Sequence, residues 1–308
     1  MAEKTIRIGT RDSELALWQA HTVERKLNDL GYQTEIIAVK SQGDILLDKP
    51  LYELGITGIF TKTLDIAMIN GDVDIAVHSM KDVPTALPIG IVQAAVLERA
   101  SALDILVHKG NLDFLYHKGT IATGSLRRQA QWLHRYPEHT VVDLRGNVNT
   151  RMQKLHDNNW NGAIFAAAGL ERINLKPSDY IDLEWMIPAP AQGAMVVVAM
   201  ANDAFSREAV AHLNHKGTEI CTHVERQFLK TLEGGCTAPI GALAVIENQT
   251  LFLKASLLSL DGREKMAIER ETYLDDYSDF GTICATDILE NGGAELMLSI
   301  KTALGNKS

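Results

Sequence analysis

The sequence predicts an α/β protein with a small α+β region at its C-terminal end. Short apolar runs alternate with segments of helical periodicity through the first two thirds of the chain, a pattern typical of largely parallel sheets covered by helices. Beyond residue 215 strands follow one another with hairpin-type turns between them. A chain of 308 residues is too long for one simple core, so two or three domains are expected.

The first group of expected elements begins with a buried strand at residues 5–9. Asp12 or Ser13 caps the helix that follows, and Gly31 ends it. Residues 42–58 lack periodicity and are expected to form a loop. The other elements of this group are strands at 35–39, 74–77 and 91–96 and a helix at 59–70.

A second group repeats the alternation, and a third group differs from it. The second has strands at 104–107, 120–123, 141–144 and 163–167, with helices at 125–136 and 149–158. A further strand at 195–200 is expected to return to the first group. The third has helices at 218–232 and 280–300 and strands at 242–246, 251–260 and 265–271, with turns at Glu247-Asn248 and Asp261-Gly262.

Composition and charge exclude several classes of partner. A hydrophobic fraction of 46% and a charged fraction of 22% are ordinary for a soluble globular protein, and a net charge of -9 disfavours nucleic acid and anionic membranes. Three cysteines argue against a secreted disulfide framework, and the polar N-terminal residues lack the apolar stretch of a signal peptide. The longest apolar run, 194–201, is too short to span a bilayer. A cytoplasmic protein is therefore expected.

Six arginines occur where strands end or where the next helix begins. Ligands of open α/β sheets bind beyond the carboxyl ends of the strands, where helix N-termini favour anions and a guanidinium group can hold a carboxylate. A single such arginine pairs with an acidic neighbour or faces water about as often as it binds a ligand, but six favour a ligand with several carboxylates or phosphates. The six are Arg11, Arg127, Arg128, Arg145, Arg151 and Arg172, and the strand-end hydroxyls Ser13, Ser79, Thr123 and Ser125 add donors.

Asp82 and Cys236 have side chains suited to chemistry. Asp82 directly follows an expected strand, where a carboxylate either caps a turn or acts as a general acid or base. Cys236 follows Gly234-Gly235, which leave its sulfur on an accessible loop suited to covalent attachment. An inert cysteine at a helix end is an equally good interpretation of this pattern. Cys221 and Cys284 fall within expected helices and are assigned to the core.

Common nucleotide and metal motifs are absent from the sequence. It has no Walker loop, no Gly-x-Gly-x-x-Gly after a strand and no His-Glu-x-x-His. Its ten histidines are scattered, and His78 and His223 are expected to fill structural roles. No metal site is therefore expected.

Five segments together resemble the signature segments of porphobilinogen deaminases in residues, order and spacing. The resemblance runs from about residue 5 to the C-terminus, and a chance match to all five segments is not credible. The segments are residues 8–19 (IGTRDSELALWQ), 77–84 (VHSMKDVP), 125–128 (SLRR), 144–151 (LRGNVNTR) and 232–241 (LEGGCTAPIG).

This resemblance implies three domains. The first two resemble type II periplasmic binding proteins or transferrin lobes, with the active cleft between them, and the third is a small α+β domain that supplies a cofactor cysteine. The implied boundaries are residues 1–98 with 194–214 for domain 1, 99–193 for domain 2 and 215–308 for domain 3. A monomer is the family expectation.

The resemblance also implies the site residues. Cys236 matches the residue that carries a dipyrromethane cofactor through a thioether, and Asp82 matches the catalytic carboxylate that contacts pyrrole nitrogens. Cofactor-binding positions are matched by Ser79, Lys81, Asp82, Thr123, Ser125, Arg127, Arg128, Arg145 and Gly146. Substrate-binding positions are matched by Arg11, Ser13, Gln19, Arg151, Arg172 and Gln192.

The implied activity is hydroxymethylbilane synthesis, a transferase reaction of porphyrin and heme biosynthesis. Porphobilinogen loses ammonia to give an electrophilic azafulvene, the free α-position of the terminal pyrrole attacks it, and Asp82 stabilises the positive charge on pyrrole nitrogen. Four rounds and a hydrolysis release the linear tetrapyrrole. The sulfur of Cys236 is then an anchor, and neither metal nor nucleotide takes part.

The sequence departs from the family pattern at four positions. Glu53 and Thr57 stand in the 46–58 loop, where lysines are common. Gly124 replaces a usual serine, which removes one donor, and Ala191 replaces a usual glycine before Gln192. None of the four changes is at Cys236 or Asp82, so activity is expected.

Two other functions are open from the residues alone. A non-enzymatic, two-lobed anion-binding protein would use the strand-end arginines, but it leaves Gly234-Gly235-Cys236 unexplained. A cysteine-dependent acyl or phosphoryl transferase would need a histidine partner, and no histidine has a recognisable spacing from the cysteine.

Overall fold

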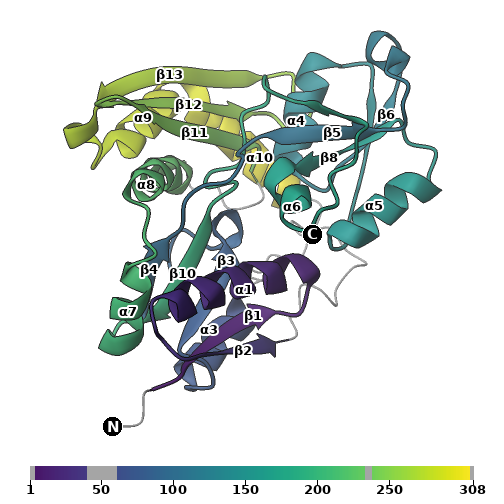
Figure 1. Ribbon diagram of the computed structural model, residues 1–308. Helices are drawn as coiled ribbons and strands as arrows, with labels where there is room; N and C mark the ends of the chain where they lie inside the picture. The colour runs from purple at the N-terminus through teal and green to yellow at the C-terminus, as the bar shows by residue number, and fades with distance from the viewer. Residues whose placement is uncertain (1–3, 40–60, 233–237, 306–308) are drawn as a thin grey trace. The chain divides into compact units, whose positions relative to one another are not determined.

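The computed structural model describes residues 4–39, 61–232 and 238–305 (Figure 1). The described chain forms two compact units, of which the first comprises residues 4–39, 61–100 and 193–219. The second comprises residues 101–192, 220–232 and 238–305. The expected loop at 42–58, with Glu53 and Thr57, lies outside the described residues, and the three-domain boundaries stay a prediction.

The first unit is built on a five-stranded sheet in the order β2-β1-β3-β10-β4. β1 pairs in parallel with β2 and β3, whereas β10 is antiparallel to β3 and β4. Residues 195–200 thus return to the first sheet, as the sequence predicts. The strands are β1 (Ile6–Arg11), β2 (Thr34–Val39), β3 (Ile75–Ser79), β4 (Ile91–Val96) and β10 (Met195–Met200).

Helical periodicity accounts for how α1 packs on this sheet. Ala20, Val23 and Leu27 lie on one face of α1 and are buried in a core cluster with Ile6 and Ile8 of β1. Full burial of an aliphatic side chain of this size contributes about 1.5–3 kcal/mol. The α-helices of this unit in Figure 1 are α1 (Glu14–Asp29), α3 (Lys62–Ile69) and α7 (Ala204–Ala211).

The second unit contains a five-stranded sheet in the order β7-β6-β8-β5-β9. β6 pairs in parallel with β7 and β8, and β5 is antiparallel to β8 and β9. Its strands are β5 (Asp104–His108), β6 (Thr120–Ala122), β7 (Thr140–Val142), β8 (Gly162–Ala166) and β9 (Tyr180–Asp182), and its helices include α4 (Leu126–Arg135), α5 (Val148–Asp157) and α6 (Ala167–Arg172).

Both five-stranded sheets contain the same kinds of strand in the same order. Three parallel strands are followed by one antiparallel strand, β10 or β5, and then by an edge strand, β4 or β9. This arrangement confirms the predicted α/β class with two related sheets. β6 and β7 are shorter than expected and end at Ala122 and Val142, so Thr123 and Arg145 lie on the turns that follow the strands.

The C-terminal part of the second unit confirms the predicted α+β region. Its antiparallel sheet has the order β11-β12-β13, with β11 (Ile240–Glu247), β12 (Thr250–Leu258) and β13 (Lys265–Tyr273). Figure 1 shows this sheet with the helices α8 (Lys216–Thr231), α9 (Phe280–Ile288) and α10 (Ala294–Gly305). None of the described helices has both the length and the apolar character needed to cross a membrane.

Two expectations for this region are wrong in detail. The single helix expected at 280–300 is divided, because Asn291 and Gly292 are non-helical and Gly292 has φ 107°, which glycine adopts readily. The first hairpin turn is formed by Asn248-Gln249 rather than Glu247-Asn248, with Asn248 at φ 56°. Asparagine tolerates this left-handed conformation better than most residues, which explains the one-residue shift.

Gly281 allows α9 to pack closely against α8. A Cβ at this position would overlap the carbonyl oxygen of Val224 and lie 2.8 Å from the Cβ of Gln227. We expect Gly281→Ala to lower the free energy of unfolding by about 2 kcal/mol, because the helices must move apart. Gly305→Ala is the matched control, since its Cβ would meet nothing within 4 Å. Chemical denaturation of the two variants measures the difference, and equal midpoints would contradict this role of Gly281.

Candidate active site

In the first unit, neighbouring parallel strands carry two of the predicted site residues at their carboxyl ends. β1 ends at Arg11 and β3 ends at Ser79. The Nε2 of Gln19, a buried residue of α1, donates to the Oγ of Ser79 at 2.8 Å. Ser13 is the N-cap residue of α1, although its side chain makes no capping hydrogen bond. The structure therefore brings together Gln19, which the family resemblance implies for the site, and Ser79, one of the strand-end hydroxyls.

Lys81 and Asp82 lie on a single 3-10 turn, Met80–Asp82, directly after β3. Met80 is buried, and its backbone N–H donates to the carbonyl oxygen of Ala194 at 3.0 Å, which holds the turn beside β10. Lys81 and Asp82 are half-buried. Asp82 is thus fixed at the end of the strand, at the place where open α/β sheets bind ligands.

His78 precedes Ser79 on β3 and is buried. Its Nε2 has no hydrogen-bond partner among the described residues. Burial, together with the positive charge of Arg11, lowers the pKa of the imidazole from 6.5 to about 4. His78 is therefore neutral at pH 7, which agrees with the structural role expected for it.

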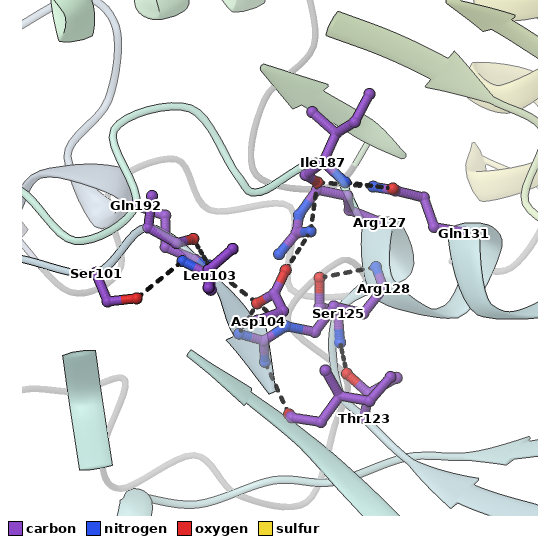
Figure 2. Close-up of polar contacts among 12 residues, drawn as sticks. Ser101, Leu103, Asp104, Thr123, Ser125, Arg127, Arg128, Gln131, Ile187 and Gln192 are labelled. Carbon is purple, nitrogen blue, oxygen red and sulfur yellow. Dashed lines mark hydrogen bonds and ion pairs between the residues drawn. The ribbon is translucent and has the colours of Figure 1, made fainter. Parts of the chain in front are cut away.

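In the second unit, Arg127 and Arg128 share one buried carboxylate. Asp104, the first residue of β5, is fully buried, and its Oδ2 accepts from Nη1 of Arg127 at 2.7 Å. Its Oδ1 accepts from Nε of Arg128 at 2.9 Å, contacts Nη2 of the same residue at 2.8 Å, and accepts from Nε2 of Gln192 at 3.0 Å. Figure 2 shows Asp104 between these three side chains.

The charges of this group do not cancel. Complete burial would by itself raise the pKa of the Asp104 carboxyl, but Arg127, Arg128 and the hydrogen bond from Gln192 lower it below its usual range. Counted over the described residues of this group, one carboxylate faces two guanidinium groups, which leaves one excess positive charge. The Nε of Arg127 is buried and donates to no described residue. An anion is the ligand that such a group favours.

Thr123 and Ser125 order the start of α4, the helix that carries both arginines. The Oγ1 of Thr123 accepts from the backbone N–H of Ser125 at 3.2 Å, and the Oγ of Ser125 accepts from the backbone N–H of Arg128 at 3.4 Å (Figure 2). Between them, Gly124 lies against the turn after β7, since a Cβ on Gly124 would lie 3.3 Å from Oδ1 of Asp143. The ends of β6 and β7 are therefore adjacent.

The other predicted arginines of this unit follow β7 and β8, the two parallel strands that flank β6. Arg145 follows β7 and is buried, and its Nε donates to no described residue. The next residue, Gly146, has φ 111°. Arg151 lies within α5, which Asn147 caps through a 2.9 Å hydrogen bond from the backbone N–H of Thr150. Arg172 ends α6, and burial lowers its pKa to about 10, so it stays charged at pH 7.

No sequence pattern predicted a role in the site for Asp104. Its only signal was an acidic residue at the head of the apolar run Ile105-Leu106-Val107, where a charge is costly to bury without a partner. Cys236 lies outside the described residues. The structure joins Gln19 with Ser79, and it joins Arg127, Arg128 and Gln192 with Asp104. Thr123 and Ser125 instead bond to backbone N–H groups at the start of α4.

Each of the two units thus contains an α/β sheet of the same strand arrangement, with arginines at or after the carboxyl ends of parallel strands. Two family models match this chain: "Porphobilinogen deaminase, dipyromethane cofactor binding domain" over residues 6–208, and "Porphobilinogen deaminase, C-terminal domain" over residues 219–290. The chain belongs to the porphobilinogen deaminase family. Hydroxymethylbilane synthesis, a transferase reaction of tetrapyrrole formation, is the activity of this family, and dipyrromethane is its cofactor.

Relatives of nearly the same length support this membership. A porphobilinogen deaminase of Desulfitobacterium hafniense is 40% identical over 97% of this chain and 99% of its own length. One of Chlorobium phaeobacteroides is 38% identical over 97% of this chain and 99% of its own length. These relatives favour the enzyme over a non-enzymatic binding protein.

Solved structures similar to this chain include two periplasmic proteins. A periplasmic substrate-binding protein of an ABC transporter from Coxiella burnetii is 15% identical over 68% of this chain and 91% of that chain, with a TM-score of 0.42. The periplasmic VFT2 domain of BvgS from Bordetella pertussis is 12% identical over 67% of this chain and 85% of that chain, with a TM-score of 0.41.

The buried, neutral His78 predicts a pH dependence of stability. The unfolded chain binds a proton at this residue near pH 6.5, whereas the folded chain does so only near pH 4. The stability contributed by the neutral imidazole is therefore present above pH 6.5 and is lost as the pH falls toward 4. Between pH 7 and pH 5 this loss is about 2 kcal/mol.

Urea denaturation at both pH values, on the unaltered protein and on His78→Gln, measures this contribution. We expect His78→Gln to lose less stability between pH 7 and pH 5 than the unaltered protein does. His212→Gln, at an exposed histidine, is the control and should keep the full dependence. The same loss in all three proteins would contradict the assignment to His78.

Proposed function

We propose that this chain performs the family's reaction with its strand-end arginines as carboxylate-binding groups, Asp82 as catalytic carboxylate and Cys236 as covalent anchor. The observation that carries the binding role is the pair of buried Nε–H groups on Arg127 and Arg145, which have no acceptor among the described residues. Buried donors without acceptors are costly, and a ligand carboxylate would satisfy them. The excess positive charge around Asp104 supports the same ligand class.

These residues fit a dipyrromethane with acidic side groups. When bound, the dipyrromethane supplies the free pyrrole α-carbon at which porphobilinogen units are joined. Guanidinium groups and hydroxyls on the turns after β3, β6 and β7 would hold its carboxylates by charge-assisted hydrogen bonds. The residues proposed for this role are Ser79, Lys81, Thr123, Ser125, Arg127, Arg128, Arg145 and Gly146, with Cys236 as the point of attachment.

Asp82 is proposed to act on pyrrole nitrogen. Its half-buried position on the turn after β3 suits a carboxylate that acts on a cation at close range. There it would stabilise the positive charge that develops during condensation and pass the released proton to water. The substrate-binding residues are proposed to be Arg11, Ser13, Gln19, Arg151, Arg172 and Gln192.

We further propose that the chain works as a monomer in the cytoplasm, without nucleic acid, membrane or metal. The net charge of -9 and the three cysteines support this proposal. We also propose the division into residues 1–98 with 194–214, 99–193 and 215–308, supported by the separate sheets that these ranges contain. Sedimentation equilibrium of the purified protein tests the monomer.

The covalent anchor predicts a mass. Intact-mass measurement of the purified protein should give the chain plus two linked pyrrole units, and Cys236→Ser should lack this increment because its side chain has no thiol. Cys284→Ser is the matched control, since the Cys284 thiol is buried and burial raises its pKa to about 11. An active protein with the mass of the bare chain would refute the anchor.

The proposed role of Asp82 predicts that its substitution leaves cofactor attachment intact and lowers turnover. Asp82→Asn removes the negative charge with little change of shape, so we expect the added mass and the melting temperature to persist while kcat falls by about 1000-fold. Asp72→Asn, at an exposed aspartate, should keep kcat. Turnover of Asp82→Asn within about twofold of the unaltered protein would contradict a catalytic role.

A further inference from the structure

Asp104 contacts several of the proposed site residues but is itself inaccessible. It is fully buried, and its two oxygens accept from Arg127, Arg128 and Gln192 (Figure 2). A carboxylate in this position cannot reach a ligand in solvent. Any effect that it has on the reaction must pass through the side chains that it holds.

Each of the two guanidinium groups is fixed at two points. Nη1 of Arg127 donates to Asp104 at 2.7 Å and to the carbonyl oxygen of Ile187 at 2.7 Å. Nε of Arg128 donates to Asp104 at 2.9 Å, and its Nη1 donates to the carbonyl oxygen of Ile164 at 3.0 Å. Two acceptors in different directions, on one amino group in Arg127 and on two nitrogens in Arg128, restrict the plane of a guanidinium group more than a single acceptor does.

Without Asp104, Arg127 and Arg128 would keep their contacts to the carbonyl oxygens of Ile187 and Ile164 and lose the carboxylate that they share. Two positive charges would then lie next to each other in a buried region and repel. The flexible arginine side chains would turn apart or draw in other anions, so their donors would no longer be aligned in advance. Preorganised donors contribute to catalysis because they need no rearrangement as charge develops.

We propose that Asp104 is a positioning residue of the deaminase, which holds Arg127 and Arg128 in the orientation that receives the carboxylates of the growing pyrrole chain. This inference rests on the proposed role of the arginines. If Asp104 acts only through Arg127 and Arg128, removal of its charge should slow turnover only because these two side chains lose their fixed orientation. The effect of Asp104 should therefore become smaller when one arginine is already missing, because only the other guanidinium group is left to position.

The chain contains a second ion pair with a buried carboxylate for comparison. Asp74, in the first unit, has only 8% of its side chain exposed, and its Oδ1 lies 2.9 Å from Nη2 of Arg7. Its described contacts include none of the proposed site residues; they are to Lys4, Arg7 and the N–H groups of that segment. Asp74→Asn should therefore lower stability without changing turnover per folded molecule.

The experiment compares Asp104→Asn, Asp74→Asn, Arg128→Gln and the double variant Asp104→Asn/Arg128→Gln. Each is purified as holoenzyme, its folded fraction is measured by circular dichroism, and kcat and KM for porphobilinogen are measured per folded molecule. Intact mass gives the distribution of covalently extended forms in each. A misplacement of this kind costs on the order of 100-fold in kcat/KM.

We expect Asp104→Asn to lose on the order of 100-fold in kcat/KM and to change the distribution of extended forms. The double variant should lose clearly less than the product of the two single losses, because part of the effect of Asp104 passes through Arg128 and changes that act through one group are not additive. Turnover of folded Asp104→Asn equal to that of Asp74→Asn would overturn the proposal. A double variant in which the two losses multiply would overturn it as well.

Two further results keep the test decisive. If Asp104→Asn does not fold, Asp104→Glu takes its place, since it keeps the charge and displaces the carboxylate by one methylene, and the same two comparisons apply. Arg128→Gln on its own tests the proposed function: normal turnover there would refute the arginine role itself. Impaired Arg128→Gln beside unimpaired Asp104→Asn would refute only the positioning role.

Discussion

The ion pair that Asp104 makes with two arginines is the interaction on which the candidate site of the second unit depends. Arg127 and Arg128 are only 4% and 6% exposed, and unpaired guanidinium groups at that depth would be strongly destabilising. One carboxylate makes their burial tolerable but leaves an excess positive charge. Buried ion pairs add little net stability on average, so orientation of the arginines is a better account of this arrangement than stability.

The same contacts fix the segment that leads into Gln192. The carbonyl oxygen of Ile187 accepts from Arg127 and, at 2.8 Å, from Nε2 of Gln131, while the N–H of Ile187 donates to Oε1 of Gln131 at 2.8 Å (Figure 2). The carbonyl oxygen of Pro188 accepts from the N–H of Ala242 in β11 at 3.0 Å. Residues 187–192 thus connect α4, β5 and the C-terminal sheet, so the arginine geometry is shared by three parts of the second unit.

Sequence patterns predicted most of this fold because they report local chemistry. Alternating apolar runs and helical periods gave the two α/β sheets, and the strand-end rule selected arginines that do follow the parallel strands β6, β7 and β8. The partner of Arg127 was not predictable in this way, because Asp104 lies 23 residues earlier and only the antiparallel pairing of β5 with β8 brings it near. The break at Gly292 was hidden because apolar residues continue at helical spacing on both sides of it.

Two departures from the family pattern lie beside this ion pair, and the structure gives each a physical consequence. Ala191 has φ 62°, a left-handed conformation that costs a non-glycine residue about 1–2 kcal/mol. Its N–H donates at 2.6 Å to the buried carboxylate of Glu225, and Gln192 after it is held by Ala102 and Asp104, so these hydrogen bonds offset the strain. At Gly124 the missing side chain lets the turn after β6 approach the turn after β7. Gly124 therefore offers no side-chain hydroxyl, but it lets the backbone before Ser125 lie close to the backbone at Leu144, which directly precedes Arg145. The relative positions of Arg127, Arg128 and Arg145 thus depend on how closely these two turns approach each other.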